Sequence, residues 1–309
     1  MLDTIGHTPI VRLQRLVSPG SAEVWVKLEA NNPTGSYKDR MALAMIEGAE
    51  RSGRLRPGQT VVEYTGGSTG SSLAFICALK GYPLRIVSSD AFAEEKILTM
   101  RAFGVGVEIV PSPEGITPDL IPRMMARASE IVVETGGFAT DQLRNTDSLN
   151  GYRTLGEELA DQLHGRIDAF CTWVGVSGCF LGVTRALRDR GITLHRAVVE
   201  PAESAVLSGR QATGPHRIEG GGIGFWPPLL SPDDFDEAIA VSTEEAFAMA
   251  RRAAREEGIW SGPSTGANLV AALRLAERLG PGRRVAAIQV DSGLKYLGGD
   301  LYRMTEVDQ

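Results

Sequence analysis

Short apolar runs of strand length alternate along the chain with longer runs in which apolar residues recur every three or four positions. The strand-like runs are 23–29, 60–64, 84–88, 105–110, 131–133, 169–174, 195–200 and 284–290. The helix-like runs are 39–51, 72–79, 93–103, 119–129, 149–163, 182–190, 243–257 and 266–279. Strands that alternate with helices over short connections predict parallel sheets covered by helices on both faces, so the expected fold class is α/β.

Two further segments qualify this alternation. Ser242 and Glu245 have the spacing of a capping box, which predicts a helix that begins here and ends at Gly258. Residues 201–228 form a long irregular stretch, and loops of this length in compact domains are usually functional or disordered. No internal repeat or low-complexity linker divides the chain.

Loops rich in glycine and hydroxyl residues follow several of the predicted strands and lead into helices. Four of them are 31–40, 65–70, 175–182 and 261–266. In open α/β sheets, ligands bind at the carboxyl ends of the strands, where glycines allow close approach and free helix amides attract phosphate. Residues 175–179 combine two glycines and a serine without a carboxylate, so they are the best candidate for binding a phosphate.

The first of these loops places Lys38 at a strand-to-helix corner. An amine beside a helix N-terminus and partly removed from water becomes more nucleophilic. A lysine alone is usually a solvated surface residue. Together with the three later loops, however, Lys38 predicts a binding site for a phosphorylated cofactor.

The bulk composition narrows the class of protein. Of 309 residues, 43% are hydrophobic and 23% charged, as in ordinary globular proteins. The formal net charge of −6 argues against a nucleic-acid partner, which would need a basic surface. No apolar run is long enough for a membrane span and no signal peptide is evident, so a cytoplasmic location is expected. Three cysteines and four scattered histidines lack metal spacing, and no metal is predicted.

Other motifs fit the sequence less well. No GxxxxGK[ST] segment is present, and the glycines of 220–224 lack the strand-then-helix context of a dinucleotide fingerprint. A serine nucleophile at Ser68 with Lys38 as its base would use the same loops. A Ser/Lys hydrolase therefore stays open as an alternative of a different class, as does a non-catalytic binding protein.

Residues 31–40, with their Ser-x-Lys-Asp-Arg core, resemble the cofactor-lysine motif of the cysteine synthase and cystathionine β-synthase family. Further resemblances follow in order at 6–13, 65–70, 142–145, 175–179, 214–225, 264 and 291–293, so they extend over almost the whole chain. The resemblance implies a pyridoxal-phosphate enzyme of fold type II, similar to the tryptophan synthase β subunit. Such an enzyme has two subdomains with a cofactor cleft between them. Here 1–34 and 143–309 would form the larger subdomain, and 35–142 the smaller, mobile one that carries the carboxylate-binding loop.

The resemblance also implies roles for individual residues. Lys38 would hold pyridoxal 5'-phosphate as a Schiff base and then act as general acid–base at the substrate's α-carbon. The other cofactor-binding residues would be Ser68, Gly175, Val176, Ser177, Gly178, Cys179 and Ser264. The amides of 175–179 would bind the phosphate, and Ser264 would bind the pyridine nitrogen. The substrate carboxylate would be bound by Thr65, Gly66, Gly67, Thr69 and Gln142.

Three positions depart from the family's motifs near the centre of the implied site. Ser68 stands where the family has an asparagine beside the cofactor's ring hydroxyl oxygen. Gly66 replaces a serine that helps to bind the carboxylate, and Cys179 replaces a threonine of the phosphate cup. The resemblance therefore defines the class of chemistry better than the substrate.

The implied reaction is β-replacement on a serine-like amino acid through an aminoacrylate intermediate. O-acetylserine or a similar ester would react with sulfide or another thiol to give cysteine or an analogue. Ser264, as a neutral partner, would leave the pyridine nitrogen unprotonated, which favours α,β-elimination. The alternative is elimination alone, as in a desulfhydrase or a serine/threonine dehydratase. Family members are usually homodimers, so a homodimer is expected here.

Overall fold

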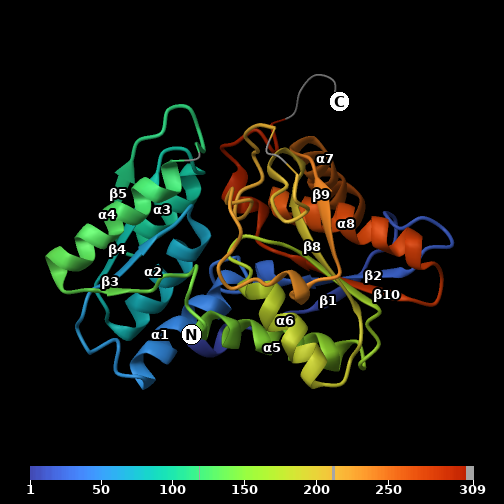
Figure 1. The fold of residues 1–309 in the computed structure, drawn as a ribbon, viewed down its shortest axis with the longest axis horizontal. Helices are drawn as coiled ribbons and strands as arrows, with labels where there is room; N and C mark the ends of the chain where they lie inside the picture. Colours follow the sequence, from blue (N-terminus) through green and yellow to red (C-terminus); the bar gives the residue numbers. More distant parts are fainter. Residues whose placement is uncertain (118, 211–212, 304–309) are drawn as a thin grey trace.

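The computed structural model describes residues 1–117, 119–210 and 213–303, and its strands form two separate sheets (Figure 1). The strands are β1 (Ile10–Arg12), β2 (Glu23–Leu28), β3 (Val61–Tyr64), β4 (Leu84–Ser89), β5 (Gly106–Val110), β6 (Phe138–Ala139), β7 (Ala169–Trp173), β8 (His195–Pro201), β9 (Glu237–Val241) and β10 (Arg284–Gln289). The α-helices are α1 (Lys38–Arg51), α2 (Ser68–Lys80), α3 (Glu94–Ala102), α4 (Leu120–Thr135), α5 (Asp147–Gln162), α6 (Gly178–Asp189), α7 (Thr243–Arg252) and α8 (Pro263–Leu279). Among these residues, no helix combines the length and apolarity needed to cross a membrane.

The two sheets are almost entirely parallel. The larger has the order β1-β2-β10-β7-β8-β9, and only the β1–β2 pair is antiparallel. The smaller has the order β5-β4-β3-β6 with every pair parallel. This arrangement confirms the predicted α/β class with parallel sheets flanked by helices.

Both faces of the larger sheet are buried, because successive side chains of its strands enter different cores. Phe170 and Ile288 belong to the core that contains residues of α1, α5 and α6, whereas Cys171 and Ala287 belong to the core that contains residues of α8. Figure 1 shows α5 and α6 below this sheet and α7 and α8 above it. In parallel strands that are buried on both faces, successive side chains alternate between two cores in this way.

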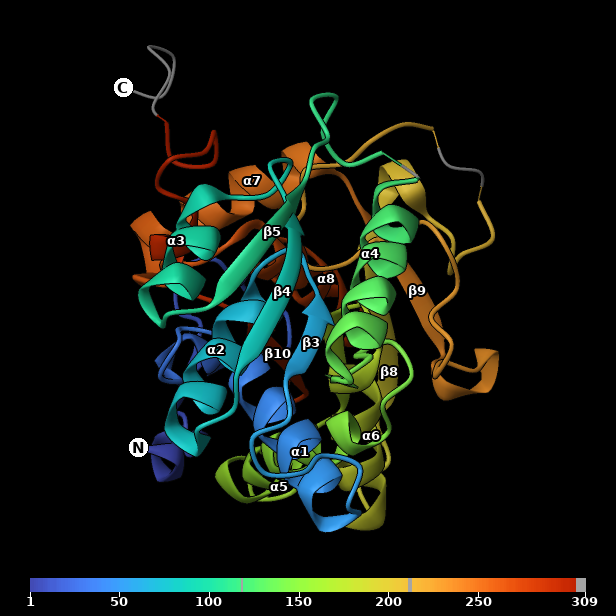
Figure 2. The ribbon, with the colours of Figure 1, turned by 90° about the vertical axis from the view of Figure 1, so that its left-hand side faces the viewer.

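The smaller sheet lies between α4 on one face and α2 with α3 on the other (Figure 2). Val62 and Val87 pack in one core with residues of α4. Val61 and Ile86, on the opposite face, share a core with Phe170 of the larger sheet. The two sheets are therefore connected through a common core, which also contains residues of α1, α2, α5 and α6.

The strands follow the predicted division of the chain. Every strand of the smaller sheet lies within 35–142, and every strand of the larger sheet lies outside it. Helix α1 lies within 35–142 but packs closely on α5, which lies outside this range. A Cβ atom on Gly151 of α5 would lie 2.2 Å from the carbonyl oxygen of Arg40 in α1. The subdomain boundaries and the mobility of the smaller subdomain stay predictions.

The predicted capping box is confirmed, and so is the helix end. The amide of Glu245 donates to Ser242 Oγ at 3.2 Å, and the Ser242 amide donates to Glu245 Oε2 at 3.0 Å. After α7 the chain continues through a π-helical turn, Ala253–Glu257, to Gly258, whose φ is +71°.

The strand predicted at 131–133 is wrong, because these residues belong to α4. Ile131 is fully buried while Val133 is 84% exposed, which fits the period of a helix whose one face is covered. The strand β9 was not predicted at all. It forms an edge of the larger sheet, and its two alanines have low strand propensity.

Candidate active site

A cavity of about 680 Å³ is lined by residues that lie at or beyond the ends of strands of both sheets. Residues that follow β3, β6, β7 and β10 contribute to it, so the cavity lies at the carboxyl ends of these parallel strands. Ligand sites of open α/β sheets occur at this edge, and the volume is typical of a small-molecule site.

Most of the predicted site residues meet at this cavity. The lining includes Lys38, Thr65, Gly66, Gly67, Ser68, Thr69, Gln142, Gly175, Val176 and Ser264. Ser177, Gly178 and Cys179 are not part of the lining and lie where α6 begins. Each of the four loops singled out in the sequence thus reaches the same cavity, while the roles of the individual residues stay predictions.

Lys38 is the first residue of α1 and is only 6% exposed. Its Nζ lies 5.0 Å from the centroid of the Tyr37 ring, and no hydrogen bond or ion pair in the described part of the chain involves this atom. Burial lowers the pKa of Lys38 to about 8, although the nearby carboxylates of Glu63 and Asp291 act in the opposite direction. The amine is therefore available to a ligand, and near neutral pH a larger fraction of it is uncharged than for a surface lysine.

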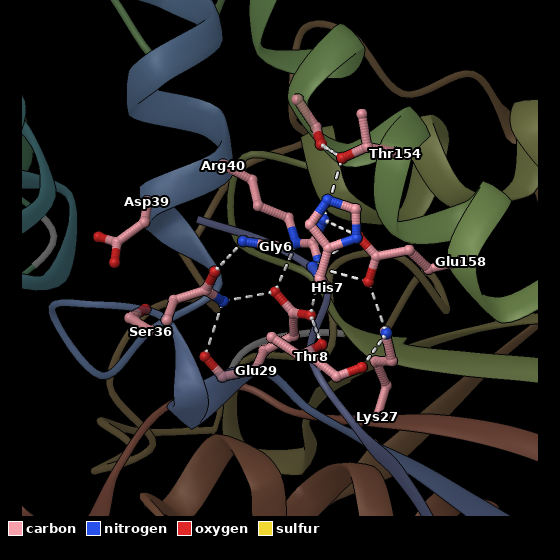
Figure 3. A network of polar contacts seen from close by, with 12 residues as sticks. Gly6, His7, Thr8, Lys27, Glu29, Ser36, Asp39, Arg40, Thr154 and Glu158 are labelled. Carbon is pink, nitrogen blue, oxygen red and sulfur yellow. Dashed lines mark hydrogen bonds and ion pairs between the residues drawn. The ribbon is translucent and has the colours of Figure 1, made fainter. Parts of the chain in front are cut away.

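A buried network of charges holds this corner of α1 in place (Figure 3). Arg40 donates two hydrogen bonds to Glu29, from Nε at 2.8 Å and from Nη2 at 2.9 Å. Its Nη1 donates to Glu158 Oε1 of α5 at 2.7 Å, and Glu158 also accepts from Lys27 Nζ of β2 at 2.6 Å. Because Arg40 lies two residues beyond Lys38, the network attaches the first turn of α1 to β2 and α5 and so orients Lys38.

The loop between β3 and α2 has a backbone that only glycine can adopt at Gly67. Its φ is +131°, and a Cβ atom there would lie 2.5 Å from Lys96 Cβ. At the end of the loop, Thr69 Oγ1 donates to Gln142 Oε1 at 2.8 Å, and Gln142 Nε2 donates to the Tyr64 carbonyl at 3.1 Å. The loop and Gln142, which the resemblance assigns to one carboxylate site, are therefore in direct contact.

Glu63 lies behind this contact and was missed in the sequence. It is 1% exposed, and its Oε2 accepts from Thr140 Oγ1 at 2.6 Å and from the Gln142 amide at 3.1 Å. Burial raises the pKa of Glu63 to about 7, and these hydrogen bonds only partly offset the rise. A carboxylate in the middle of an apolar strand is the sequence signal that could have revealed it.

The stability of the protein is expected to fall relative to a Glu63→Gln variant as the pH rises from about 4.5 to about 7. The folded state binds this proton more tightly than the unfolded chain does. The resulting stabilisation is complete below the unfolded pKa and is lost as the pH rises through the folded one. Glutamine has the same size and does not titrate. Urea unfolding of both proteins across this range measures the difference, and a difference that stays constant with pH would contradict the raised pKa.

The start of α6 offers backbone amides without partners. The hydrogen bonds of the described residues include none donated by the amides of 175–179, and Ser177 has a left-handed φ of +63°. A Cβ atom on Gly175 would lie 2.4 Å from the Gly220 carbonyl oxygen, so a side chain is excluded there. Unpaired amides at a helix N-terminus form a site for an anion such as phosphate. Burial raises the pKa of the Cys179 thiol, which is therefore neutral beside this site.

Several buried polar atoms of the cavity lining have no hydrogen-bond partner among the described residues, and two of them belong to Ser264 and Asp291. Ser264 is 1% exposed, and its Oγ makes no hydrogen bond with any residue that the structure describes. Asp291 Oδ1 is also unpartnered, while Oδ2 accepts from Tyr296 Oη at 2.8 Å and from Ser68 Oγ at 3.5 Å. A ligand would have to satisfy such atoms. The free amine of Lys38, the Ser264 hydroxyl and the amides of 175–179 fit an aldehyde, a ring nitrogen and a phosphate, as in pyridoxal phosphate.

Comparison with known proteins agrees with this fit. Residues 1–291 match the family described as pyridoxal-phosphate dependent enzyme. A cysteine synthase of Staphylococcus aureus (strain Mu50 / ATCC 700699) is 40% identical over 300 residues, which are 96% of this chain and 95% of the relative. The crystal structure of an O-ureido-L-serine synthase has a TM-score of 0.91 and 34% identity, covering 99% of this chain and 96% of that one. That of an O-acetylserine-dependent cystathionine β-synthase from Helicobacter pylori has a TM-score of 0.91 and 32% identity, covering 98% of each chain.

These matches confirm the resemblance seen in the sequence and the fold type. They cover almost the whole chain, and the cavity supplies the groups that the family's cofactor needs. The chain therefore belongs to the pyridoxal-phosphate-dependent enzymes of fold type II, and within them to the cysteine synthase type.

Proposed function

We propose that this enzyme carries out β-replacement on a serine-like amino acid. O-acetylserine or a similar ester is the first substrate, and sulfide or another thiol is the second. The observation that carries the proposal is that buried Lys38 lines the same cavity as loop 65–69 and Gln142. An amine and a loop suited to a carboxylate fit an amino acid whose α-carbon lies at the amine. The similarity to a cysteine synthase supports the same class of reaction.

Each part of the cavity has a role in this proposal. Lys38 would hold the cofactor through its amine and, when that amine is free and uncharged, would take the proton from the substrate's α-carbon. The bound cofactor withdraws electrons from that carbon. The amides of 175–179 bind its phosphate, and the Ser264 hydroxyl is the neutral partner of its ring nitrogen. Residues 65–69 and Gln142 bind and orient the substrate carboxylate.

Replacement also requires that water stay out of the site between the two half-reactions. The loop assigned to the substrate carboxylate belongs to 35–142, and the residues of 213–225 that line the same cavity belong to 143–309. We expect the substrate carboxylate to draw the smaller subdomain toward the larger one, formed by 1–34 and 143–309. The homodimer and the cytoplasmic location expected from the sequence stay part of this proposal.

The partition of products tests the proposal. Holoenzyme given O-acetylserine and sulfide is expected to form cysteine as fast as the ester disappears. Amino-acid analysis and a pyruvate assay on the same samples measure the two fates. Pyruvate and ammonia appearing at the full rate of ester loss, with sulfide present and no new amino acid, would reject replacement and establish elimination.

Elimination alone, as in a desulfhydrase or a serine/threonine dehydratase, is the second candidate because of Gly66. A Cβ atom there would lie 3.0 Å from the Phe92 ring, so this ring occupies the side of the loop on which a serine would stand. A weaker hold on the carboxylate would give weaker closure and admit water. The Ser/Lys hydrolase finds no support, since the described contact of Ser68 Oγ is with Asp291 and the family's chemistry depends on the cofactor.

A further inference from the structure

The cavity wall contains a buried ion pair that the proposed reaction does not use. Lys96 of α3 is 3% exposed, and its Nζ donates to Glu219 Oε2 at 2.6 Å. The same nitrogen lies 3.3 Å from Tyr296 Oη and 4.5 Å from the centroid of the Tyr296 ring. Lys96, Glu219 and Tyr296 all line the cavity. A buried ammonium requires a counter-charge, and here Glu219 supplies it.

The ion pair lies next to the loop assigned to the substrate carboxylate. The side-chain stem of Lys96 packs against Gly67, where a Cβ atom would lie 2.5 Å from both Cβ and Cδ of the lysine. Glu219 belongs to the segment 213–225, which lies outside 35–142 and contributes residues to the lining of the same cavity. A substrate whose carboxylate is at 65–69 would therefore lie close to this ion pair.

The other charged side chains of the cavity lining show how this ion pair would affect the binding of an anionic group. The lysine, histidine and carboxylate side chains of the described lining are Lys38, Lys96, Glu114, His216, Glu219 and Asp291, and no arginine is among them. Lys38 is committed to the cofactor. Lys96 is then the remaining ammonium of the described lining, and Glu219 already neutralises it. An anionic group that entered would find no unpaired lysine or arginine in the described lining and would meet the carboxylates of Glu219, Glu114 and Asp291.

We propose that the Lys96–Glu219 pair selects substrates by charge. Serine derivatives with an uncharged β-substituent, such as an O-acyl ester, are accepted, and those with an anionic one, such as a phosphate ester, are rejected. Rejection arises because the anion must either displace Glu219 from Lys96 or lie beside its carboxylate, and like charges brought together weaken binding. This inference rests on the proposed β-replacement and specifies the class of serine derivative that enters.

The variant Glu219→Gln tests the selection, because it leaves Lys96 with an uncharged amide neighbour. The ratio of kcat/KM for O-phosphoserine to that for O-acetylserine is expected to rise by about tenfold or more. Glu114→Gln is the matched control, since it also removes a carboxylate from the cavity but releases no ammonium, and it should change the ratio much less. The double variant Lys96→Met/Glu219→Gln removes both charges of the pair and should cancel the rise.

Binding of inorganic phosphate to the holoenzyme, measured by calorimetry, provides a readout that does not depend on turnover. Glu219→Gln should bind phosphate about tenfold more tightly than the wild type, and the double variant should not. If O-acetylserine yields no new amino acid, the proposed function fails while this titration still decides the charge selection. The selection is overturned if the wild type uses both esters equally well, or if Glu219→Gln changes neither the ratio nor phosphate binding.

Discussion

Lys38→Ala is expected to abolish both the covalent attachment of the cofactor and turnover. The wild-type protein should purify yellow, with a visible absorption band that borohydride reduction removes, whereas the variant should lack this band. Loss of the acid–base group alone lowers a rate by about 10²- to 10⁴-fold, and loss of the attachment adds to this. Absorption spectra and turnover with O-acetylserine and sulfide measure the two effects.

Lys80→Ala is the control for this change. Lys80 pairs with Glu50 on the surface between α2 and α1 and does not line the cavity, so spectrum and turnover should stay as in the wild type. Peptide mapping of the borohydride-reduced protein should find the cofactor on Lys38. A colourless wild type that cannot be reconstituted with pyridoxal phosphate, or a label on Lys96, would refute the assignment of Lys38.

Arg40→Met is expected to give the largest loss of stability. It leaves Glu29, whose side chain is fully buried, without its cation. Removal of one partner from a buried ion pair costs about 3–5 kcal/mol, because the other charge remains out of water. Methionine fills much of the volume of the arginine stem, so the loss reflects charge more than a cavity. The free energy of unfolding from urea titration measures it.

Arg12→Met removes a comparable pair from the surface. Arg12 and Glu23 are 44% and 34% exposed, and such pairs contribute at most about 1 kcal/mol.

The loss of stability in Arg40→Met should also become smaller at low pH. Burial by itself would raise the pKa of Glu158, but Arg40 and Lys27 hold it down to about 2. Stabilisation through Glu158 is therefore complete above its unfolded pKa and is lost as the pH falls toward about 2. Equal losses in Arg40→Met and Arg12→Met would show that the buried network does not hold α1.

The fold class and the positions of the four loops that reach the cavity can be predicted from the amino-acid sequence alone. Turn residues, helix starts and apolar runs are local signals, and the carboxyl ends of parallel strands meet at one edge of a sheet. Lys38, loop 65–70, residues 175–176 and Ser264 could therefore be predicted to face one site, and the structure brings them to one cavity. Local signals failed where they were ambiguous, as in 131–133, whose three apolar residues fit a strand as well as the helix that α4 forms.

The charged groups that surround that site can be identified from the folded structure but not from the sequence. Lys96 and Glu219 are 123 residues apart in the sequence, and nothing in the pattern of α3 marks its single lysine as buried. In the sequence, Glu63 is one polar residue within an apolar strand. In the folded structure, Thr140 and Gln142 donate hydrogen bonds to its carboxylate. Arg40 likewise owes its role to Glu29 and Glu158, which lie on separate elements. Ion pairs and raised pKa values arise from burial and from partners brought together by folding, and neither is encoded in the local sequence.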